Sequence, residues 1–228
     1  MTEKMSILST NNILICINTC DRDKDSLSRL KDSDWYRYCQ ECSNIKIITY
    51  SAKKLEDGID FNYIDSIQHM FLNTVESYDN LSIKTFKMLS ACNLSFSFDF
   101  LLKVDCRIID NLHNNTSDLF SFENFLKAFF NETLFADYGG FTPIIGTTNN
   151  SFRQWASSKK LFVLPEIFLN EIGINSLPSN YWAGGAYCLS SQCVEKIIKQ
   201  TKLFESCKNL MGGCEDLCVG IAVNYERH

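Results

Sequence analysis

The sequence predicts an α/β fold in which a mostly parallel central sheet is flanked by helices. Short runs of aliphatic and β-branched residues alternate with longer segments whose apolar residues recur at helical spacing, most clearly in the first half of the chain. The run at 98–104 is apolar on both faces apart from Asp99 and Lys103, a pattern typical of a strand in the middle of a sheet.

Three strands and two helices are expected in the first half. Residues 45–50 are rich in β-branched side chains, which favours a strand. After Asn80, which can act as an N-cap, apolar residues recur at helical spacing. In chain order, the expected elements are a strand at 13–17, a polar turn at 18–21, a helix at 23–40, a strand at 45–50, a polar loop at 51–60, a helix at 80–93 and a strand at 98–104.

The second half is expected to add further helices and strands. A helix begins at Ser121 and carries several Phe residues on one side. That side suits a core face, and peripheral contact with a membrane is the alternative. The remaining elements are a strand at 141–146, a glycine-bearing turn that leads into a strand at 181–190, a helix at 191–200 and a short helix at 215–223.

Composition limits the classes of function. The chain has 228 residues and a net charge of -5, without long runs of either sign, which argues against nucleic acid as a partner. No apolar stretch approaches the roughly 18 residues of a membrane span, and the start does not resemble a signal peptide. A single cytoplasmic domain is therefore expected, with the eleven Cys mostly reduced and buried.

Polar residues follow the third strand, where an open α/β sheet binds its ligands. Asp105 can hold a divalent cation or a ligand hydroxyl, and Arg107 can bind a phosphate through two hydrogen bonds. A local salt bridge at the strand end is the alternative interpretation.

Two glycine-containing segments are further candidates. Gly212 and Gly213 precede Glu215 and Asp216 at the start of an apolar helix, which can present a general base or can simply cap the helix. The segment YWAGGAYCLS at 181–190 places Trp182 beside two glycines. Aromatic rings beside open space suit the binding of a sugar ring, whereas a hairpin or bulge is the alternative.

Four blocks in this order resemble the motifs of the β-1,3-galactosyltransferase and Fringe-like family. YDNLSIKT at 78–85 is similar to Y-x-N-L-[TS]-x-K-T, and FLLKVDCR at 100–107 stands where the family has a strand ending in K-x-D-D-D. The segment at 181–190 resembles Y-x-x-G-x-G-Y-x-[LM]-S, and EDLCVG at 215–220 resembles E-D-V-x-x-G. The region before residue 78 is only loosely similar.

The resemblance implies a GT-A fold and an inverting transfer of a sugar from a nucleotide-sugar, normally a UDP-sugar, to a hydroxyl of a glycan or glycolipid. It divides the single domain 1–228 into a nucleotide-binding part, about 1–110, and an acceptor part, about 111–228. The implied base is Asp216. The implied nucleotide-sugar residues are Thr19, Lys84, Asp105 and Arg107, and the implied acceptor or sugar residues are Trp182, Gly184, Gly185 and Glu215.

The chain departs from the family motif at two positions. Cys106 and Arg107 replace the second and third acids, and the third acid usually binds Mn²⁺. Arg107 then replaces the cation and pairs with the diphosphate, or Asp105, with help from Asp110 or solvent, still holds Mn²⁺ or Mg²⁺ weakly, or the protein binds its ligand without catalysis. Because Asp216 and the glycine segment are retained, an active enzyme is favoured, with a slight preference for metal independence.

Overall fold

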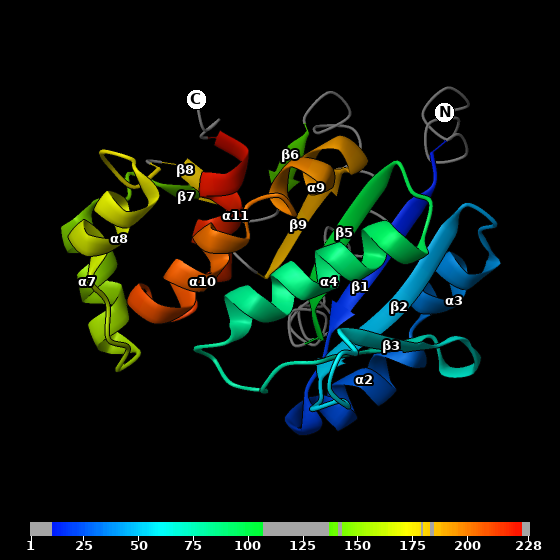
Figure 1. Ribbon diagram of the computed structural model, residues 1–228. Coiled ribbons are helices and arrows are strands. Elements are labelled where there is room, and N and C mark those ends of the chain that lie inside the picture. The colour runs from blue at the N-terminus through cyan, green and yellow to red at the C-terminus, as the bar shows by residue number, and fades with distance from the viewer. Residues whose placement is uncertain (1–10, 107–136, 141–142, 179, 183–184, 225–228) are drawn as a thin grey trace.

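A seven-stranded sheet forms the centre of the computed structural model, which describes residues 11–106, 137–140, 143–178, 180–182 and 185–224 (Figure 1). The strand order is β3-β4-β2-β1-β5-β9-β6. The strands are β1 (Ile13–Asn18), β2 (Ile45–Ala52), β3 (Phe61–Ile64), β4 (His69–Leu72), β5 (Phe100–Asp105), β6 (Tyr138–Gly140) and β9 (Ala186–Ser190).

Four adjacent strands, β4, β2, β1 and β5, are parallel. Strand β3 runs antiparallel to β4, β9 antiparallel to β5, and β6 antiparallel to β9. The predicted α/β class with a mostly parallel sheet is therefore confirmed. Asn18 pairs with Asp105 on one side and with Tyr50 on the other. The carboxyl ends of β1, β2 and β5 consequently lie together at one edge, called here the carboxyl edge.

Helices cover both faces of the sheet, and the side chains on both faces of β1 are buried beneath them. Leu14 and Cys16 belong to one apolar core, and Ile13, Ile15 and Ile17 to the other. The first core is covered by α4 (Leu81–Ser95), α9 (Ser191–Ile197), α10 (Thr201–Leu210) and α11 (Glu215–Asn224). The second is covered by α2 (Lys24–Lys31) and α3 (Asp34–Glu41).

A smaller group of elements extends the molecule beyond α10 and α11 (Figure 1). Strands β7 (Pro143–Ile145) and β8 (Asn180–Trp182) form an antiparallel pair. Helices α7 (Asn149–Ser158) and α8 (Pro165–Ile172) lie next to this pair, and α8 packs against α10. None of the described helices is both long and apolar enough to cross a membrane.

The single helix predicted over 23–40 is wrong, because the structure has two helices there. Asp32 ends α2, and Ser33 has an extended backbone. The Ser33 hydroxyl donates to Leu30 O at 2.5 Å and accepts from Tyr36 N at 3.4 Å, so it closes one helix and caps the next.

Other local predictions need correction too. Asn80 is the N-cap residue of α4, but its side chain makes no capping bond and instead donates to Ser77 Oγ. The loop predicted at 51–60 starts later, because β2 extends to Ala52. Strands β3, β4 and β6 and helices α7, α8 and α10 were not predicted, nor were the 3-10 turns η1 (Asp21–Asp23) and η2 (Asp65–Ile67). The helix expected from Ser121 lies outside the described residues, as do residues 141–142 of the strand expected at 141–146.

Candidate active site

Two adjacent pockets open at the carboxyl edge. The first, called the Asp105 pocket, has a volume of about 230 Å³ and is lined from the ends of β1 and β5, η1 and the segment before α4. The second, called the His69 pocket, has a volume of about 430 Å³ and is lined mainly from α2, β2 and β4. Thr19, Cys20 and Glu76 line both pockets. The two pockets therefore lie side by side, at the edge where open α/β sheets bind ligands.

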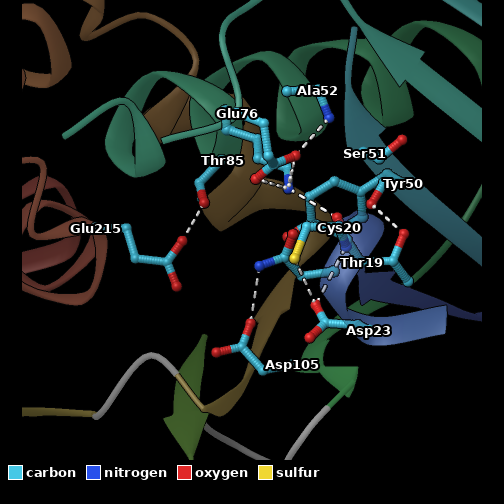
Figure 2. Close-up of polar contacts among 12 residues, drawn as sticks. Thr19, Cys20, Asp23, Tyr50, Ser51, Ala52, Glu76, Thr85, Asp105 and Glu215 are labelled. Atoms are coloured by element: carbon cyan, nitrogen blue, oxygen red, sulfur yellow. Dashed lines mark hydrogen bonds and ion pairs between the residues drawn. The ribbon is translucent and has the colours of Figure 1, made fainter. Parts of the chain in front are cut away.

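A buried lysine connects the end of β5 to the start of α11. Lys103 Nζ lies 2.8 Å from Asp105 Oδ1 and forms a second ion pair with Glu215. The other oxygen of Glu215 accepts from the Thr85 hydroxyl of α4, and Asn18 Nδ2 donates to Asp105 Oδ1 at 3.0 Å (Figure 2). These bonds tie β1, β5, α4 and α11 together below the Asp105 pocket.

Burial and charge act in opposite directions within this network. Burial alone would lower the pKa of Lys103, but Asp105 and Glu215 outweigh it and raise that pKa. Burial raises the pKa of Glu215 to about 7, and the Asp105 carboxylate adds to this, against the opposing effects of Lys103 and Thr85. Lys103 therefore stays charged at neutral pH, while Glu215 titrates near it.

Lys84 organises the boundary between the two pockets. The residue is only 1% exposed. Its ammonium group donates to Thr19 O at 3.0 Å and to both carboxylate oxygens of Glu76 at 2.9 and 2.8 Å. Glu76 in turn accepts from Ala52 N at 3.0 Å (Figure 2). The segment before α4 is thereby attached to the ends of β1 and β2. Lys84 shapes both pockets through Glu76, which lines each of them.

Asp216 lies in the first turn of α11, next to the buried network. Its Oδ1 accepts from Leu217 N and from Cys214 Sγ, each at 2.8 Å, and the residue is partly exposed. Partial burial raises the pKa of Tyr78, which is 48% exposed, and the neighbouring groups Cys214, Asp216, Glu215 and Asp105 raise it further. Tyr78 lines the Asp105 pocket. Asp105 and Asp216 therefore both lie within electrostatic range of this one side chain of the pocket.

Strand β8 places an aromatic residue beside α11. A Cβ atom added to Gly220 would lie 2.5 Å from Tyr181 Cβ, so α11 packs directly against β8. Trp182 N donates to the Tyr138 hydroxyl at 3.1 Å, which fixes Trp182 next to β6. Asp216 contributes to the raised pKa of Tyr181, after the larger effect of burial, which places this acid near β8 as well.

The structure brings five of the nine predicted site residues together at the carboxyl edge, namely Thr19, Lys84, Asp105, Gly185 and Glu215. Asp216 and Trp182 line neither of the two pockets. Asp105, Thr19 and Lys84 line the Asp105 pocket, and Asp105 N donates to Gly185 O at 2.8 Å. Glu215 is 3% exposed, and both of its oxygens are used inside the network, so it supports the site from below. The predicted residues Arg107 and Gly184 lie outside the described residues.

Sequence reasoning did not select Lys103, Glu76 and Asn18 as site residues. A charged residue inside the apolar run of β5 is a recognisable signal for Lys103. Glu76 and Asn18 carry no such signal, because each acquires its role from a partner distant in the sequence: Lys84 for Glu76 and Asp105 for Asn18.

The described residues contain no cluster of acidic, His or Cys side chains typical of a metal site, and Asp110 lies outside them. No group of three or more His, Cys, Asp or Glu side chains that could hold an ion occurs among them. Asp105 was the predicted ligand, and its Oδ1 already accepts from Lys103 and Asn18. Lys103 therefore competes with a divalent cation for the Asp105 carboxylate.

Comparison with known proteins gives one family match. A family model described as Galactosyltransferase matches residues 59–226, which is more than half of the chain. The matched region contains Lys84, Asp105, Trp182 and Asp216 and begins shortly before β3. No curated protein sequence matches the chain.

Proposed function

Because the chain belongs to the galactosyltransferase family and hence to the glycosyltransferases, we propose that it moves a sugar from a nucleotide-sugar to a glycan hydroxyl with inversion. One observation carries the proposal. Lys103 contacts both Asp105 and Glu215, the residue before Asp216, so the end of β5 and the start of α11 meet at the carboxyl edge. A donor-side acid and an acceptor-side acid then flank one site.

The donor is proposed to occupy both pockets. Its nucleoside enters the larger His69 pocket, and its diphosphate and sugar extend into the Asp105 pocket. Arg22 lines the Asp105 pocket and is the exposed cation there among the described residues. Together with Arg107, it is proposed to neutralise the diphosphate, so a divalent metal is not required. A UDP-sugar is the first candidate, because the family resemblance favours it.

Asp216 is proposed to accept the proton of the acceptor hydroxyl. The oxygen then forms its bond to the anomeric carbon while the bond from that carbon to the diphosphate breaks, which inverts the centre. Trp182 is proposed to stack against the acceptor glycan or glycolipid. Glu215 and Lys103 hold the start of α11, so that Asp216 stays in position during the proton transfer.

The test is transfer from a panel of nucleotide-sugars, comparing wild type with Asp216→Asn. Loss of a general base lowers turnover by about 100- to 10,000-fold, whereas UDP affinity is expected to change little. Asp57→Asn, in the exposed loop before β3, is the matched control and is expected to keep full activity. Full turnover by Asp216→Asn would rule out the assigned base.

The same assay, run with EDTA and then with Mn²⁺, tests the metal. Equal transfer rates are expected with EDTA and with Mn²⁺, and a rate restored only by Mn²⁺ would contradict the assignment of Arg22 and Arg107 as the cations.

The replacement of two motif acids by Cys106 and Arg107 favours a second candidate, a module that binds nucleotide-sugars or glycans without turnover. Calorimetric binding of UDP without transfer or hydrolysis of any donor would identify that module.

A further inference from the structure

The His69 side chain holds two hydroxyl groups in the wall of the His69 pocket. His69 Nδ1 lies 2.7 Å from Thr49 Oγ1, and His69 Nε2 lies 2.9 Å from Ser51 Oγ. Thr49 and Ser51 are two positions apart on β2, so both side chains are on the face that His69 contacts. All three residues line the pocket. The proposed transfer step uses none of them.

The direction of each hydrogen bond depends on where the Thr49 hydroxyl places its one hydrogen. Two acceptors are within its reach, Gln68 O at 3.3 Å and His69 Nδ1 at 2.7 Å. When the hydroxyl donates to Gln68 O, its lone pairs face His69, which then carries its hydrogen on Nδ1 and accepts at Nε2 in the neutral ring. In that arrangement Ser51 donates its single hydrogen to Nε2, and its oxygen offers only lone pairs to a ligand in the pocket.

The surroundings of His69 favour the neutral ring that this arrangement needs. Burial lowers the pKa of His69, and the charges of Lys31 and Lys84 lower it further. The other charged side chains that line the pocket are Asp21, Lys24 and Glu76. Phe71 packs edge-on against the imidazole with ring centroids 4.5 Å apart, which restricts rotation of the ring.

We propose that the Thr49 hydroxyl donates to Gln68 O, that His69 is thereby the positioning residue that fixes the Ser51 hydroxyl as an acceptor, and that Ser51 accepts a hydrogen bond from the nucleoside part of the donor. This inference rests on the proposed function, because it assumes a nucleotide-sugar donor. A uridine nucleotide has two kinds of group that can donate here, the ribose hydroxyls and N3–H of the base. A ligand group that can only accept would face the lone pairs of Ser51 and would be disfavoured.

The experiment measures UDP affinity by calorimetry, and donor KM and kcat in the transfer assay, for Ser51→Ala, His69→Phe and the double variant. Each single change is expected to weaken UDP binding by about three- to tenfold, with kcat at saturating donor unchanged. The double variant is expected to bind UDP as tightly as the single variant with the lower affinity, because both changes remove the same hydrogen bond between Ser51 and the nucleoside. Ser97→Ala, exposed near the opposite edge of the sheet, is the matched control.

Nucleotide analogues identify the donating group. The arms of the test are 2′-deoxy-UDP, 3′-deoxy-UDP and 3-methyl-UDP. The analogue that lacks the bonded hydrogen is expected to bind wild type and Ser51→Ala equally. Ser51→Ala removes only a hydroxyl, so the test does not depend on how well His69→Phe folds.

Three results would overturn the inference. The first is an unchanged UDP affinity in Ser51→Ala, and the second is that His69→Phe weakens UDP binding as much in the Ser51→Ala background as in wild type. The third is that wild type binds every analogue more tightly than Ser51→Ala does. Any of these results, with normal UDP binding by wild type, removes this inference and leaves the proposed function standing. A wild-type protein that binds no nucleotide would instead refute the proposed function.

Discussion

Glu215 is a buried carboxyl group whose neighbours act on its charge in opposite directions. Lys103 and Thr85 favour its charged form, while burial and Asp105 favour its neutral form. The balance raises its pKa to about 7, above the ordinary value of 4.5. The folded protein then holds this proton more tightly than the unfolded chain does.

The first prediction at the residue scale concerns stability against pH. The contribution of a raised carboxyl pKa is fully present below about pH 4.5 and is lost as pH rises through about 7. Between pH 5 and pH 8, the free energy of unfolding of wild type is expected to fall by about 2 kcal/mol relative to Glu215→Gln. Urea denaturation at several pH values measures this.

Glu195→Gln is the matched control, because Glu195 is exposed on α9. It is expected to follow the wild-type curve. If wild type and Glu215→Gln gave parallel curves over this range, the raised pKa would be refuted. The base assignment of Asp216 is tested separately, by the loss of turnover in Asp216→Asn.

At the scale of elements, the turn between α10 and α11 determines where Asp216 lies. Gly213 has a φ of +70°, and a Cβ added to it would lie 2.4 Å from Asp79 O. The turn therefore touches the backbone of the segment before α4 directly. This contact, with the Lys103 and Thr85 bonds to Glu215, sets the start of α11 against the Asp105 pocket.

Gly213→Ala is expected to destabilise the protein by roughly 3 kcal/mol or more, because it combines a strained φ with a clash against backbone. Gly173→Ala is the matched control. Gly173 has a φ of +75° with no atom within 4 Å of the added Cβ, so only the strain of about 1–2 kcal/mol is expected. Chemical denaturation compares the two variants, and equal losses would show that the close contact is unimportant.

At the scale of the whole molecule, both halves of the chain build the same sheet. Strands β9 and β6, from the second half, continue the sheet beside β5. The larger apolar core likewise combines Leu14 and Met88 with Phe204 and Leu217. The division into a nucleotide-binding part and an acceptor part is therefore proposed to describe roles in binding rather than two units that fold separately.

The expected consequence is one cooperative unfolding transition. The chain has three Trp, and Trp35 lies in α3 of the first half. In a Trp35→Phe variant, tryptophan fluorescence reports only Trp155 of α7 and Trp182 of β8, whereas far-UV circular dichroism reports helices and strands from both halves. The midpoints from the two signals in guanidinium chloride are expected to coincide. A fluorescence transition that precedes the circular dichroism transition would indicate that the second half unfolds on its own.

Periodicity and composition in the sequence determined the α/β class and the strands β1, β2 and β5, because these depend on local patterns of side chains. The same patterns located Asp105 at a strand end and Asp216 at a helix start. They could not separate α2 from α3, since that break depends on hydrogen bonds of Ser33. Short strands such as β3 and β4 gave too few residues for a periodic signal.

Only the tertiary structure decided which charges meet. Lys103 and Glu215 are 112 positions apart, and Ser51 and His69 are 18 positions apart on neighbouring strands. A local pattern carries no information about such partners, because they are brought together by strand pairing and by the packing of α4 and α11. The pKa of Glu215 and the orientation of the Ser51 hydroxyl depend on those neighbours, so both properties exist only in the folded chain.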